Sequence, residues 1–108
     1  MPKYSVVWSK EAQERLDEIH FYISNTAKSD IPADKFILKL IDRTILLATF
    51  PFSGQAEPHF AVAGKERRYL VEGDYKIIYR IVEDKVIITD IFHTSLNPQR
   101  LTKRDKNE

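Results

Sequence analysis

Three side chains in the second half of the sequence, Glu57, Arg68 and His93, are of types that could cleave a phosphodiester. Cleavage of RNA without a metal ion needs a base for the attacking 2′-hydroxyl and an acid for the leaving 5′-oxygen. It also needs a cation that stabilises the charge of the transition state. A carboxylate, an imidazole and a guanidinium can fill these roles, so a metal-free ribonuclease is one hypothesis.

Each of the three side chains also has a structural interpretation. Glu57 precedes a proline in a predicted surface loop, where most glutamates are solvated. His93 ends a predicted buried strand and could be an imidazole that is hydrogen-bonded to the backbone. Arg68 lies inside a predicted strand, where its partner could be the carboxylate of Glu66 or Glu72.

Basic side chains near Arg68 are candidates for binding phosphate or RNA. The candidates are Lys65, Arg67, Lys76 and Arg80. The whole chain has 17 basic and 16 acidic residues, so nucleic-acid binding would depend on such a local cluster rather than on net charge. Alternatively, Lys76 and Arg80 cover the open face of a sheet with their methylene groups.

Several classes of site and location are not expected. The sequence has no cysteine, which excludes disulfides and thiolate zinc sites. It has no Gly-rich phosphate loop and no His-x-Glu or Glu-x-x-His pair, so neither a catalytic metal nor a cofactor is predicted. No apolar run approaches the roughly 20 residues of a membrane span, and we expect a cytoplasmic protein without a membrane partner.

The first half of the chain predicts a strand followed by a helix hairpin. Apolar residues alternate over residues 3–8, and Ser9 is a candidate N-cap for a helix that ends near Asn25. A second helix should have Pro32 in its first turn and end at Phe50. The apolar face of the first helix has spacings of four, three and four residues: Ala12, Leu16, Ile19 and Ile23.

The second half predicts a loop over residues 51–64 and then an antiparallel meander. Its strands are expected at residues 67–71, 75–82 and 86–93. One face of the middle strand is apolar and should pack on the helices, leaving the other face more open. That apolar face consists of Tyr75, Ile77, Tyr79 and Ile81.

The order of elements is therefore β-α-α-β-β-β. It predicts an α+β fold in which a two-helix hairpin packs on an antiparallel sheet. One domain is expected over residues 1–98, followed by a polar tail at 99–108 that is either a short helix from near Pro98 or a frayed end.

Several short motifs in this order resemble the RelE/ParE toxin superfamily, over about residues 3 to 101. They are the opening strand and helix (residues 4–23), Phe50-Pro51 with Ser53-Gly54, the hairpin of residues 68–80, and residues 91–98. The resemblance implies the toxin of a type II toxin–antitoxin system, also called a plasmid stabilisation protein, which a cognate antitoxin holds inactive.

The superfamily contains two mechanisms. RelE-like members cleave mRNA inside the ribosome, whereas ParE-like members inhibit DNA gyrase. We interpret the chain as a RelE-like endoribonuclease with the ribosome and mRNA as partners. The alternatives are a ParE-like gyrase inhibitor without catalytic activity and a degenerate toxin that binds only its antitoxin.

The resemblance also assigns roles to residues. In the YoeB-like branch a Glu before the sheet, an Arg on the first sheet strand after the helices and a His ending the last strand perform the cleavage; Glu57, Arg68 and His93 match these places. Lys76 matches a position that RelE-like members use on phosphate. Residues 94–95 (Thr-Ser) lack the aromatic and the arginine of many relatives, which argues against nuclease activity.

The apolar surplus of the second helix predicts a binding surface. Ile45, Leu46 and Leu47 are consecutive and cannot all face one core. We therefore expect an exposed apolar groove, along the helix hairpin or the sheet edge, for an amphipathic antitoxin segment.

Overall fold

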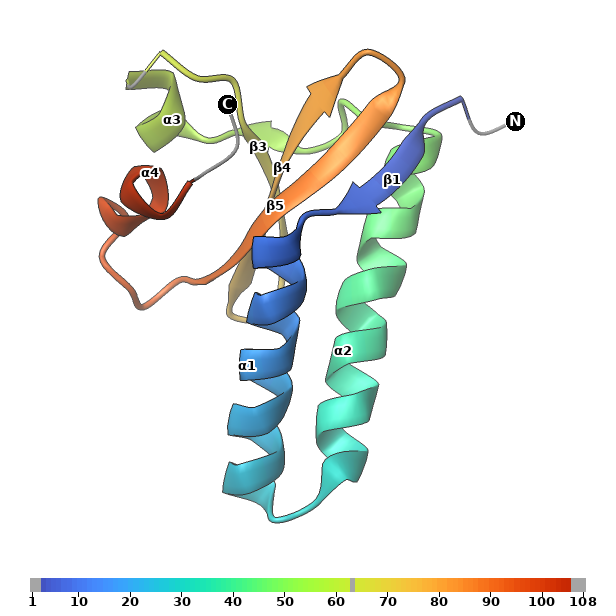
Figure 1. The fold of residues 1–108 in the computed structure, drawn as a ribbon, viewed down its shortest axis with the longest axis vertical. Coiled ribbons are helices and arrows are strands. Elements are labelled where there is room, and N and C mark those ends of the chain that lie inside the picture. The colour runs from blue at the N-terminus through green and yellow to red at the C-terminus, as the bar shows by residue number, and fades with distance from the viewer. Residues whose placement is uncertain (1–2, 63, 106–108) are drawn as a thin grey trace.

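The computed structural model describes residues 3–62 and 64–105. A helix hairpin packs on one face of a five-stranded sheet and extends beyond it, while two short helices lie on the other face (Figure 1). The elements are β1 (Ser5–Trp8), α1 (Lys10–Ala27), α2 (Asp30–Ile45), a 3₁₀ turn (Leu46–Ala48), β2 (Gln55–Ala56), α3 (Pro58–Val62), β3 (Arg68–Glu72), β4 (Tyr75–Val82), β5 (Lys85–His93) and α4 (Arg100–Arg104).

Local capping explains the helix hairpin. The Ser9 side chain accepts a hydrogen bond from the backbone N–H of Ala12 (3.1 Å), as the predicted N-cap should. Helix α1 runs two residues past Asn25 and ends where Lys28 adopts a left-handed conformation (φ 55°). Ser29 then caps α2 at once, so the connection is short enough to hold the helices antiparallel.

Helix α2 begins as predicted but ends earlier than predicted. It starts at Asp30, which places Pro32 in the first turn as expected. Its regular part ends at Ile45, and the chain continues as a 3₁₀ turn before Pro51. The apolar pattern does not distinguish the tighter turn from α-helix, because both repeat about every three to four residues.

The sheet has the strand order β1-β5-β4-β3-β2. Its strands are antiparallel as predicted, except that β1 pairs with β5 in parallel, with Ser5 beside Lys85. Alternation of apolar residues is the same for both strand directions, so the sequence pattern could not reveal this pair.

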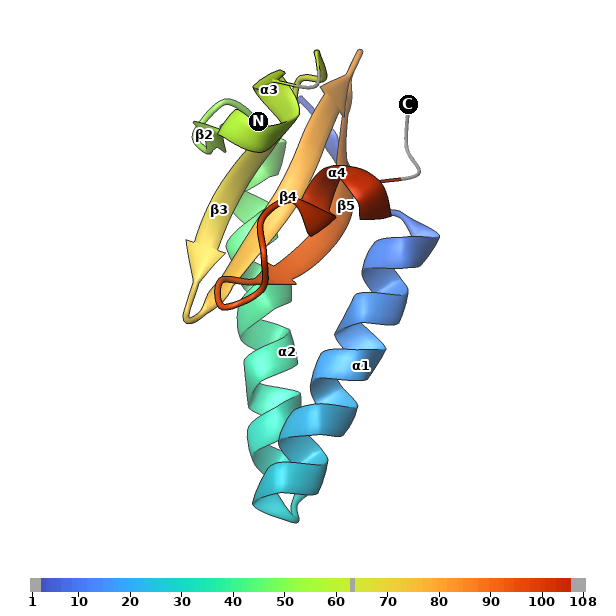
Figure 2. The same ribbon diagram turned by 90° about the vertical axis from the view of Figure 1, so that its left-hand side faces the viewer.

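The two faces of the sheet support two cores. The predicted apolar face of β4 packs on the helices, where Ile77 and Tyr79 are fully buried with Ile19 and Leu40. The other face is not open around Ile78, because α3 and α4 cover it (Figure 2). The second core consists of Phe60, Ile78, Phe92 and Leu101.

Two segments differ from a simple loop and tail. The predicted loop of residues 51–64 contains β2 and α3, which at two and five residues are too short to produce a periodic pattern. The tail forms α4, in agreement with the short-helix alternative, and Leu101 anchors it in the second core. Residues 106–108 of that tail lie outside the described residues. None of the described helices is long and apolar enough to cross a membrane.

Candidate functional site

The carboxylate of Glu57 is buried rather than solvated, which corrects the prediction of a surface position. Its side chain is 0% exposed. One oxygen accepts hydrogen bonds from the backbone N–H (3.0 Å) and Nδ1 (2.7 Å) of His59, and the other lies 3.0 Å from Lys76 Nζ. Burial alone would raise the pKa of Glu57, but these bonds outweigh it and hold the pKa below its ordinary value.

The basic candidates are largely engaged within the protein. Besides pairing with Glu57, Lys76 has its ammonium 4.5 Å from the centre of the Tyr69 ring. Lys65 and Arg67 both bind the carboxylate of Asp105, at 3.2 and 2.8 Å. Arg80 is the exception, since the described ranges supply it with no hydrogen bond or ion pair; it lines a shallow hollow of about 360 Å³ together with Lys65 and Arg67.

Arg68 stabilises the loop that leads from the helix hairpin to β2. Its Nη1 donates hydrogen bonds to the carbonyls of Gly54 (2.8 Å) and Phe52 (3.3 Å), and the guanidinium lies 5.0 Å from the centre of the Phe52 ring. The alternative ion pair with Glu66 or Glu72 is not formed. Instead, backbone carbonyls accept from this arginine.

Tyr79 also stabilises this loop through hydrogen bonds of its buried side chain. Its buried hydroxyl donates to the carbonyl of Pro51 (2.8 Å) and accepts from the N–H of Gly54 (2.9 Å). Any Cβ at Gly54 would collide with this hydroxyl and approach the carbonyl of Tyr69 to 2.8 Å, so only glycine fits here. Gly54 of the Ser53-Gly54 motif is therefore required by packing.

His93 is the last residue of β5 and contacts Tyr75, which packs on the helices. Its ring is edge-on to Tyr75, with the centroids 4.9 Å apart. Its Nδ1 accepts a hydrogen bond from the backbone N–H of Ser95 (3.0 Å), and the Ser95 hydroxyl lies 2.7 Å away. Because Nδ1 is an acceptor, the ring proton of a neutral His93 is on Nε2.

The three catalytic candidates do not meet at one place. Arg68 pairs across the sheet with Tyr79, which faces the helices, whereas Lys76, the partner of Glu57, pairs with Phe92 of the second core. Glu57 and Arg68 therefore serve opposite faces of the sheet. His93 pairs with Tyr75, four residues from Tyr79, which is roughly 13 Å along the strands.

Sequence reasoning missed a buried carboxylate, Asp90. Burial raises its pKa, although Arg104 (2.5 Å) and Arg15 (3.3 Å) partly offset this effect. Asp90 therefore connects α1, β5 and α4. The signal in the sequence was an acidic residue within the apolar run of the last strand, which demands a partner when buried.

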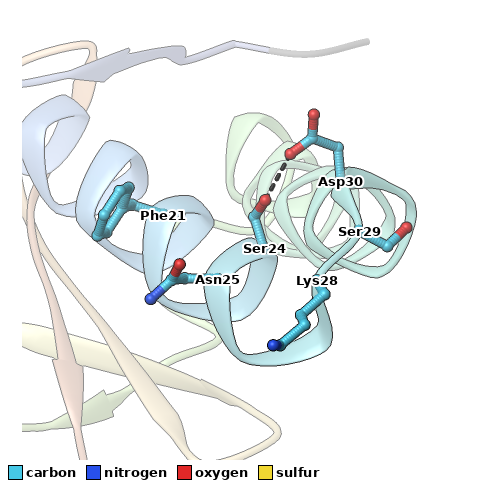
Figure 3. A pocket seen from close by; sticks show the side chains of 6 residues that line it. All are labelled: Phe21, Ser24, Asn25, Lys28, Ser29 and Asp30. Carbon is cyan, nitrogen blue, oxygen red and sulfur yellow. Dashed lines mark hydrogen bonds between the residues drawn. The ribbon is translucent and has the colours of Figure 1, made fainter.

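An open hollow of about 490 Å³ lies at the tip of the helix hairpin (Figure 3). Its lining is mostly polar, and the Ser24 hydroxyl donates to the carboxylate of Asp30. The lining residues are Phe21, Ser24, Asn25, Lys28, Ser29 and Asp30. Within the described residues no group of three or more His, Asp or Glu side chains could hold a metal ion.

A model of the family described as "ParE toxin of type II toxin-antitoxin system, parDE" matches residues 6–98. The chain belongs to this toxin family. Membership implies a cognate antitoxin as a partner. A search of curated proteins finds no match.

The fold of this chain is similar to that of a solved structure. The structure described as "Chromosomal ParDE TA system from P. aeruginosa" matches with a TM-score of 0.68 and 18% sequence identity. The match covers 84% of the present chain and 96% of that chain. At this identity the likeness concerns the fold alone.

Proposed function

We propose that this ParE-family toxin arrests growth by binding DNA gyrase and does not cut RNA. The observation that carries the proposal is the separation of Glu57, Arg68 and His93. In-line cleavage needs its base, acid and charge-stabilising groups around one phosphate, within hydrogen-bond reach of its oxygens. Groups on two faces and at two ends of a sheet favour a protein that acts by binding.

The present contacts of the candidates also support a binding function. Using Glu57 as a base would require removing a buried carboxylate from His59 and Lys76, and breaking such a pair commonly costs about 3–5 kcal/mol. Arg68 holds backbone carbonyls that would lose their donors if it turned toward RNA. Each of these side chains already has a structural role.

Purified toxin provides the direct test of this proposal. We expect it to inhibit supercoiling by gyrase in vitro, while transcripts from arrested cells show no new cuts in primer extension. His93→Gln should retain both results, since His93 has no part in the proposed activity. Ribosome-dependent cuts that disappear in His93→Gln would instead establish the RelE-like mechanism.

We further propose that the antitoxin pairs with the outer edge of β3. Strand β2 covers only Arg68 and Tyr69 of that edge, and no strand among the described residues pairs with the rest, Leu70 to Glu72. The side chain of Val71 is 48% exposed there. An unpaired edge beside an exposed apolar side chain suits an added strand from another chain.

The antitoxin proposal is tested by Val71→Asp, which should weaken antitoxin binding by tenfold or more in a titration. The matched control is Val62→Asp, because Val62 is 91% exposed and belongs to α3 rather than to this edge. Equal affinities for both variants would contradict the edge as the docking site.

A further inference from the structure

Helix α2 carries an apolar ridge on the side that faces away from the core. Ile31, Leu38 and Ile45 are 65%, 60% and 61% exposed, and we call these three residues the α2 ridge. Leu40, on the opposite side of the helix, is fully buried. As the sequence predicted, residues 45–47 do not all face one core: Leu47 is buried, while Ile45 and Leu46 are exposed.

The spacing of the ridge is that of a helix-pairing seam. Its members are seven residues apart, and seven residues make about 700° of rotation, only about 20° short of two turns. The ridge is therefore nearly straight along the helix. Leu38 lies at the middle of α2 (Asp30–Ile45), with one isoleucine near each end. Reversing the helix therefore leaves the pattern unchanged.

We propose that the α2 ridge pairs with the same ridge of a second copy of this chain, antiparallel, about a two-fold axis beside Leu38. Each Leu38 then meets the partner's Leu38, and Ile31 meets the partner's Ile45. The contact is isologous, as a closed dimer requires. The opposed helix dipoles add a small favourable term.

Charges beside the ridge select the second copy and its direction. Lys35 and Asp42 lie about 40° and 20° to the same side of Ile31. In the antiparallel pair Lys35 lies on the same side of the seam as the partner's Asp42 and within one residue, about 1.5 Å, of its height, and the symmetry makes this contact twice. A parallel two-fold pair has no such contact, because it places Lys35 of one copy and Asp42 of the other on opposite sides of the seam. Lys39 lies further round the helix, about 80° from Ile31, and stays in solvent.

The contact area is small, so the dimer should be weak. The ridge and Leu46 contribute four partly exposed aliphatic side chains per copy, fewer than the 20–30 residues a side of a standard interface. We therefore expect a reversible dimer with a dissociation constant on the order of 10–100 µM. The inference does not depend on the proposed target of the toxin.

Sedimentation equilibrium of the isolated full-length toxin, freed from its antitoxin, tests the dimer. The wild type should pass from monomer to dimer over this concentration range, and Leu38→Asp should weaken the association at least tenfold. Val62→Asp, at a still more exposed apolar side chain on α3, should leave it unaltered. Circular dichroism of each variant separates loss of association from loss of fold.

Charge reversal tests the direction of the helices. Lys35→Asp alone brings two carboxylates together at each symmetric contact, and Asp42→Lys alone brings two ammonium groups together. Each should weaken association by roughly tenfold, and the double variant should restore it, because the pairs reform with the charges exchanged. Failure of the double variant to recover would overturn the antiparallel pairing.

Cross-linking gives a geometric test, since the chain has no cysteine of its own. Leu38→Cys should form a disulfide dimer on oxidation, whereas Ile31→Cys should not. In the antiparallel pair the two positions 31 are 14 residues apart along the helices, about 21 Å. Equal cross-linking of both variants would refute the proposed axis. A toxin that stays monomeric at 500 µM (about fivefold above the expected range), with Leu38→Asp abolishing antitoxin binding, would assign the α2 ridge to the antitoxin instead.

Discussion

Replacing Arg68 with alanine distinguishes a structural arginine from a catalytic one. The change removes the 2.8 Å bond to the Gly54 carbonyl, the 3.3 Å bond to the Phe52 carbonyl and the contact with the Phe52 ring. The shorter bond comes from a charged donor and contributes about 1–2 kcal/mol. The longer bond is exposed, and it and the ring contact together add about 0.5–1 kcal/mol.

The expected loss of unfolding free energy for Arg68→Ala is therefore about 1.5–3 kcal/mol. For a domain of this size that loss lowers the melting temperature by roughly 7–13 °C. Urea denaturation followed by circular dichroism measures the free energy directly. The matched control is Arg80→Ala, on the neighbouring strand, whose side chain forms no hydrogen bond or ion pair in the described part of the chain; we expect a change below about 0.5 kcal/mol.

Growth arrest completes the comparison. At a temperature where both variants are folded, Arg68→Ala should remain toxic, because the residue acts through the loop and not on a substrate. Arg68→Lys should recover part of the lost stability, since an ammonium can donate to these carbonyls but does not reproduce the planar guanidinium beside the Phe52 ring. The reasoning fails if Arg68→Ala unfolds like the wild type yet loses toxicity.

Three further predictions concern the buried polar and apolar groups. Tyr79→Phe should cost about 2–3 kcal/mol in urea denaturation, because it leaves a buried N–H and a buried carbonyl without partners, whereas Tyr69→Phe, with an exposed bond, should cost under about 0.5 kcal/mol. The folded pKa of Glu57 lies below its ordinary value of 4.5, so the carboxylate stabilises the fold above pH 4.5 and this stabilisation is lost as pH falls through the folded pKa. Glu57→Gln should therefore flatten the acid dependence of the unfolding free energy, and an unchanged slope would contradict this assignment. Leu101→Ala should cost about 2–3 kcal/mol if α4 is part of the fold, and no measurable change would show that the second core contributes nothing.

The main elements of the fold could be predicted because each is long enough to repeat its apolar pattern several times. Helix α1 and the meander of β3, β4 and β5 each repeat their apolar pattern several times, so the spacing alone distinguishes helix from strand. Strand β2 and helix α3 are too short to show such a repeated pattern. The burial of Glu57 depends on these two elements and on Lys76. That contact joins residues 19 apart in the chain, beyond the reach of a local pattern.

The separation of the catalytic candidates was partly accessible from the sequence. The two-residue turn at Gly73 and Asp74 fixes the pairing of β3 with β4, which sets Arg68 opposite Tyr79. Since neighbouring residues of a strand point to opposite faces, Arg68 and Lys76 must then lie on different faces. The resemblance to the catalytic branch identified matching residue types, but it did not show that they lie on different faces of the sheet.

The parallel pair of β1 and β5 governs when the molecule can fold during its synthesis. Ser5 and its partner Lys85 are 80 residues apart, so Lys85 is translated long after Ser5. Contacts of such long sequence separation raise the contact order and delay completion of the sheet. A nascent chain that lacks β5 has an unpaired β1 and an incomplete core, so this toxin should acquire activity only after β5 has left the ribosome.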